Sequence, residues 1–117
     1  MVEEKAKDLG RLIGQSPEYQ ALKRSSESLN DDREAVALLQ QMEKLRGEAQ
    51  QLIQRGENPT PEMEQQLDSM LEKIQSQSAY QRAVAAQENF DKLMLRVNQW
   101  IMDGMKKGAA SPIITLS

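Results

Sequence analysis

From Arg33 onward the chain carries a long heptad repeat, and this feature limits most strongly what it can fold into. The apolar residues of this segment alternate between steps of three and four. They are Ala35, Leu38, Met42, Leu45, Ala49 and Leu52. Such spacing keeps one seam of an α-helix facing a partner helix. Residues 32–55 are therefore predicted to form a long central helix of about 36 Å, which needs helical partners.

A second long helix is predicted near the C-terminal end, over residues 77–106. Its apolar seam alternates steps of four and three along Ala79, Ala83, Ala86, Phe90, Leu93, Val97 and Trp100. The preceding stretch, Gln75–Ser78, is polar but contains neither Gly nor Pro. A kink, a short break and an uninterrupted helix are all compatible with it. Residues 109–117 have no helical period and are predicted to be a flexible tail.

The starts of the other helices are marked by local chemistry. A Ser/Thr-Pro-Glu order occurs at 16–18 and again at 60–62. Ser16 and Thr60 are suited to the N-cap, with proline in the first turn and an acid at the positive end of the helix dipole. Asp32 is the predicted cap of the central helix. With amphipathic segments after each start, the fold class is all-α, an antiparallel helical bundle of four to five helices in one domain, residues 1–108.

The absence of both histidine and cysteine narrows the chemistry available to this chain. Without Cys there is no disulfide, thiolate nucleophile or cysteine-held iron–sulfur cluster. Without His the commonest general base and metal ligand are missing. Ser16 would need Lys23 as a base in a desolvated pocket, whereas its neighbours fit a helix cap. Glu62 and Glu64 lie at a helix start, where acids stabilise the dipole. We therefore assign no catalytic residue, cofactor or metal ligand.

Charge and hydropathy bear on partners and location. The net charge is −3, and the basic residues are spread among acids. A nucleic-acid binder normally has a basic face, so direct binding of RNA is the alternative hypothesis, resting on Lys92, Arg96, Lys106 and Lys107. No apolar run approaches the roughly 20 residues that span a bilayer, and the first ten residues do not have the character of a signal peptide. A soluble cytoplasmic protein is expected.

The second half of the C-terminal helix is apolar on more than one side. Five apolar residues lie off the main seam: Met94, Leu95, Ile101, Met102 and Met105. A helix that is apolar over much of its circumference is usually enclosed by neighbours, so both core packing and an oligomer contact account for it. We assign an oligomer or partner interface to Leu93, Met94, Val97, Trp100, Ile101 and Met105. A homodimer or tetramer is expected.

Three segments follow one another along the chain: LIGQSPEYQALKRSSESLNDDREAVALLQQMEKLRGEAQQL, then the turn GENPTPEM, then AAQENFDKLMLRVNQWIMDGM. In this order they resemble the YlbF/YmcA family of small all-helical bacterial regulatory proteins, in its YheA-like branch. The segments are similar to the family's short helix with a Ser-x-Glu-aromatic start, its long helix and its Phe/Leu-to-Val-Asn ending. The resemblance covers about residues 9–105.

The resemblance implies a homo-oligomeric helical bundle without enzymatic activity. It also implies a role in competence, sporulation and biofilm development in Gram-positive bacteria, through a complex with YaaT that influences RNase Y-dependent RNA maturation. Some of those complexes hold iron–sulfur clusters through cysteines, which this chain lacks. The function expected is that of a non-enzymatic adaptor or regulator that contacts itself and other protein subunits.

Overall fold

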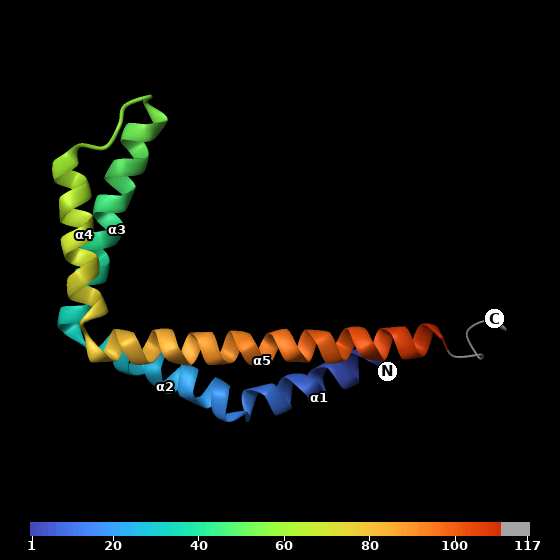
Figure 1. Ribbon diagram of the computed structural model, residues 1–117. Helices are drawn as coiled ribbons and strands as arrows, with labels where there is room; N and C mark the ends of the chain where they lie inside the picture. The colour runs from blue at the N-terminus through green and yellow to red at the C-terminus, as the bar shows by residue number, and fades with distance from the viewer. Residues whose placement is uncertain (111–117) are drawn as a thin grey trace.

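The computed structural model describes residues 1–110, and within this range it contains five α-helices and no β-strand. The all-α prediction is confirmed. The helices are α1 (Val2–Gly14), α2 (Pro17–Asp31), α3 (Arg33–Gln54), α4 (Pro61–Gln75) and α5 (Ser78–Ala109), as Figure 1 shows.

The five helices are laid out as two arms that meet nearly at a corner (Figure 1). In the short arm, α3 and α4 form an antiparallel hairpin. In the long arm, α2 packs antiparallel to the first part of α5, and α1 continues beside the far end of α5. The antiparallel packing expected of a bundle is thus present in each arm. The arms extend away from each other, so the pairs do not stack into one compact body.

The core at the corner is built by four helices. Ala35 of α3 and Ile74 of α4 are fully buried there, beside Met42. The partly buried residues packed against them come from α2, α3, α4 and α5: Leu29, Leu38, Leu39, Met70 and Tyr80. Because this cluster contains residues from helices that are far apart in the sequence, it holds the two arms together at the corner.

Both long helices lie where the heptad patterns place them, with ends shifted by at most a few residues. The polar stretch before α5 is a true break, because α4 ends at Gln75 and α5 begins at Ser78. The break is braced by Gln81, whose Nε2 donates to the Gln75 carbonyl at 2.7 Å. Ala109 still belongs to α5 and Ala110 caps it. The remainder of the predicted tail, residues 111–117, lies outside the described residues.

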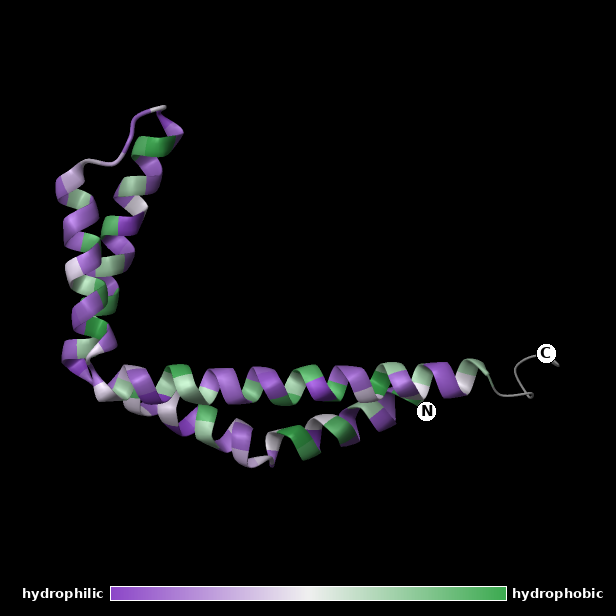
Figure 2. Cartoon of the chain, viewed as in Figure 1, coloured by the Kyte–Doolittle hydropathy of each residue, from purple (hydrophilic) through white to green (hydrophobic). Residues whose placement is uncertain are grey.

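This open shape leaves much of the chain's surface uncovered. The radius of gyration is 21.6 Å, against roughly 13 Å for a compact domain of this length. The accessible surface is 9399 Å², which exceeds that of a compact monomer of this mass by roughly 3000 Å². At most about 1000 Å² of the excess can belong to the seven residues after Ala110. A single copy therefore exposes surface that a compact fold would bury, including large apolar side chains such as Leu95 and Met102. Figure 2 shows that hydrophobic residues occur along all five helices.

Candidate protein interaction surface

The predicted cap residues occupy the N-cap positions of three helices. The Ser16 hydroxyl accepts a hydrogen bond from the Tyr19 backbone N–H at 3.1 Å and donates to the Ile13 carbonyl at 2.6 Å. Asp32 accepts from the N–H of Ala35, at 3.1 Å. Thr60 likewise accepts from the Met63 N–H. Ser16 is therefore engaged as both donor and acceptor in backbone contacts of the turn between α1 and α2.

The six residues assigned to an interface differ in exposure: one is buried, two are half-buried and three are exposed. Val97 is only 4% exposed, because it lies on the face of α5 that packs within the long arm. It belongs to the chain's own packing and offers no surface to a partner. Leu93 and Met94 are half-buried. The other three, which lie toward the C-terminal end of α5, are exposed: Trp100 (60%), Ile101 and Met105 (67%).

An open apolar groove runs between α1 and the C-terminal part of α5. Its volume is about 770 Å³. It is lined by Met1, Val2, Lys5, Ala6, Leu9, Ile101, Gly104 and Met105. No residue of α1 is fully buried, although its apolar residues lie on one face. Because α1 supplies one wall without closing on α5, both helices present apolar side chains to whatever enters the groove.

A family model described as "Control of competence regulator ComK, YlbF/YmcA" matches residues 2–106, almost the whole chain. The chain belongs to the YlbF/YmcA family. This confirms the resemblance drawn from the sequence motifs, and the family description is that of a regulatory protein.

Three curated streptococcal relatives, each named UPF0342 protein, are similar to this YlbF/YmcA protein. The Streptococcus gordonii protein is 38% identical over 61% of this chain and 63% of its own length. The Streptococcus mutans protein is 34% identical over 71% of this chain and 74% of its own length. The Streptococcus sanguinis protein is 30% identical over 84% of this chain and 88% of its own length. This chain thus matches just under two thirds of the first relative.

Sequence reasoning missed the part that α1 has in this surface. Met1 and Val2 are almost fully exposed at the edge of the groove. Two further apolar residues of α5, Leu95 and Met102, are also exposed but were not assigned to an interface. The apolar face of α1 could be recognised from the sequence. The helix beside which it lies could not, since periodicity does not tell where a short N-terminal helix packs.

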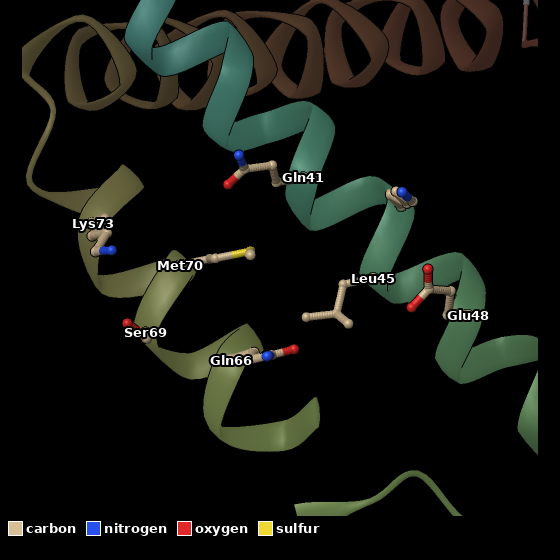
Figure 3. Close-up of a pocket in the computed structure, with 8 residues that line it drawn as sticks. Gln41, Leu45, Glu48, Gln66, Ser69, Met70 and Lys73 are labelled. Atoms are coloured by element: carbon tan, nitrogen blue, oxygen red, sulfur yellow. The ribbon is translucent and has the colours of Figure 1, made fainter. Parts of the chain in front are cut away.

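The short arm of this YlbF/YmcA protein carries a different kind of hollow (Figure 3). The space between α3 and α4 has a volume of about 390 Å³, and Leu45 and Met70 point into it from the two helices. Its rim is polar: Gln41, Lys44, Glu48, Gln66, Ser69 and Lys73. Within residues 1–110, no three His, Cys, Asp or Glu side chains converge as metal ligands would.

The basic residues named for RNA binding do not form a continuous groove. Lys92 and Arg96 line a hollow beside Glu18, at the start of α2. Lys106 and Lys107 lie in the last turn of α5, with Asp103 one turn before. Along residues 1–110, none of the helices combines the length and apolar character that crossing a bilayer requires.

Proposed function

We propose that this protein is a non-enzymatic regulatory adaptor that self-associates and acts by binding other proteins. The observation that supports this most directly is the groove at the far end of the long arm, where α1 and α5 together expose apolar side chains. Contiguous exposed apolar surface on a small protein is characteristic of an interaction site. The absence of His and Cys from the sequence supports a non-enzymatic role.

The groove suits an amphipathic helix of a partner protein. An open trough between two helices accepts the apolar face of a third helix, by side chains spaced three and four residues apart. Met1 and Met105 line it, and methionine side chains adapt their shape to a partner. In line with its family, the protein would join regulatory subunits in the cytoplasm, of the kind that influence RNase Y. Any iron–sulfur cluster there would need ligands from those subunits.

The test is a double substitution in the groove wall that α5 supplies, Ile101→Glu with Met105→Glu, because both residues line the groove. Both side chains are exposed, so the helical circular dichroism should be retained while protein partners are lost from affinity capture in the native cell. Leu12→Glu is the matched control, because Leu12 is equally exposed on α1 but does not line the groove. Unchanged capture by the double variant would contradict the proposal. Capture of transcripts without a protein would favour direct RNA binding.

Self-association is tested separately by light scattering of the purified chain. The surface left uncovered by the open fold leads us to expect a homodimer or tetramer at micromolar concentration. A monomer that persists at high concentration would contradict this part of the proposal.

A further inference from the structure

Helix α5 carries a second heptad seam on the side away from its buried face. The buried face contains Ala86 and Val97. Roughly half a turn around the helix, at about 100° per residue, a second set follows steps of four and three, and every member is exposed. We call this set the outer seam: Glu88, Lys92, Leu95, Gln99, Met102 and Lys106. At its centre are two large apolar side chains, Leu95 (61% exposed) and Met102 (56% exposed).

The outer seam faces the inside of the corner between the arms. A hollow of about 310 Å³ lies there, lined by Gln75 of α4 and by Val84 and Glu88 of α5. Figure 1 shows α1 and α2 on the opposite side of α5 from the one toward which the α3–α4 arm extends. No helix of the same copy therefore covers Leu95, Gln99 and Met102 in the middle of the outer seam. Lys92 lies at the edge of the seam nearest α2, where it also lines the hollow beside Glu18.

The outer seam is complementary to itself when reversed. If a second α5 lies antiparallel with residue 97 of each helix at the same level, Glu88 of one copy stands opposite Lys106 of the other. Leu95 then faces Gln99, and Met102 lies against the aliphatic stem of Lys92. Twofold symmetry repeats each contact, so an acid–base pair stands at either end with apolar side chains between.

The corner limits which registers are available. The α3–α4 arm stands at the start of α5, so a partner helix cannot run far past Ser78. A register centred on residue 90 would also pair Glu88 with a lysine, Lys92. It would, however, drive the last turns of the partner's α5 into the short arm. Centred on residue 97, Ala109 of the partner comes level with Ala85 and stops short of the corner.

We propose that two copies of this protein pair through the outer seams of their α5 helices, antiparallel, with the twofold axis beside residue 97. This inference rests on the self-association in the proposed function and specifies its geometry. The paired segment is about 36 Å long. A standard interface buries about 800 Å² per partner, which the uncovered surface of each copy readily supplies. The groove between α1 and α5 lies on another side of α5 and stays open to a partner.

Cysteine cross-linking tests the register, because the natural chain has no cysteine. The Leu95→Cys variant is mixed with a size-tagged Gln99→Cys variant and oxidised. The proposed register brings these positions together, so a mixed disulfide dimer should form. Arg96→Cys mixed with Asn98→Cys is the control. Those positions are at the same level and both exposed, but they point to opposite flanks, and we expect several-fold less cross-linking.

Charge reversal tests the end contacts independently. Glu88→Lys or Lys106→Glu alone should weaken the dimer about tenfold, because two exposed ion pairs become two repulsions. The two substitutions in one chain restore opposite charges and should recover the original dissociation constant. A dimer that neither cross-links at the seam nor responds to charge reversal would overturn this pairing and leave the proposed function standing. A persistent monomer would overturn both the pairing and the proposed self-association.

Discussion

The ring of Tyr19, in the first turn of α2, packs against the ring of Phe90 in the middle of α5. The ring centroids are 5.8 Å apart and the planes are inclined by 59°. Tilted rings at this distance place the positive edge of one near the negative face of the other. The contact comes one turn after the Ser16 cap, so it holds the start of α2 against α5.

Replacing Phe90 with Ala should lower the free energy of unfolding by about 2 kcal/mol, less than for a fully buried ring because Phe90 is half-buried. A double-mutant cycle with Tyr19→Ala should give a coupling of about 1 kcal/mol. Urea denaturation measures both, at one fixed protein concentration, because the proposed self-association would make stability depend on concentration. Strictly additive effects would show that the rings do not stabilise each other.

Replacing Ser16 with Ala should cost about 1 kcal/mol of stability through the lost cap of α2. The Tyr19 N–H would lose its acceptor, and the hydroxyl's bond to the Ile13 carbonyl would also disappear. Ser28→Ala is the control, because Ser28 is exposed within α2 and Ala is a better helix former there. If both substitutions changed the denaturation midpoint equally, the capping account of Ser16 would be wrong.

The helices themselves could be predicted from the sequence because periodicity and caps are local properties. The seam of α3 and the Ser/Thr-Pro-Glu starts depend on residues within a few turns of one another. The layout of the arms is different. One uninterrupted seam on α5 runs from Ala79 to Trp100, yet Ala79 and Val97 are buried while Trp100 is exposed. A periodic pattern tells which face is apolar, but not how far a neighbouring helix covers it.

The candidate site was predicted only in part for the same reason. Trp100, Ile101 and Met105 could be named because a helix apolar on several sides needs more than one neighbour. The position of α1 as the other wall of the groove depends on the direction of the turn around Ser16. The spacing of apolar residues does not encode that direction. The outer seam also escaped notice, because only two of its six members are apolar, and it stands out once α2 is known to occupy the opposite face.

Ile74 and Leu71 offer a matched test of the corner core. Both lie on α4, but Ile74 is fully buried among residues of the other helices, whereas Leu71 is 39% exposed. Ile74→Ala should destabilise the protein by about 3 kcal/mol, since the cavity is enclosed by several elements and cannot easily collapse. Leu71→Ala should cost less than about 1 kcal/mol. Equal losses in thermal or urea unfolding would contradict the burial difference.

Two glycines of the short arm should respond in opposite directions to alanine. Gly47 lies within α3, and a Cβ added there would meet no atom within 4 Å. Gly47→Ala should therefore raise stability by about 0.5–1 kcal/mol through better helix propensity.

Gly56 closes the same helix with φ at +80°, where its N–H donates to the Ile53 carbonyl and that of Glu57 donates to the Leu52 carbonyl. These two bonds form a Schellman motif, which needs a left-handed residue at the position of Gly56. Because a Cβ is strained in that conformation, Gly56→Ala should cost about 1 kcal/mol although there is space for the methyl group. Urea midpoints of the two variants should lie on opposite sides of the parent's, and a gain from both substitutions would contradict the left-handed end of α3.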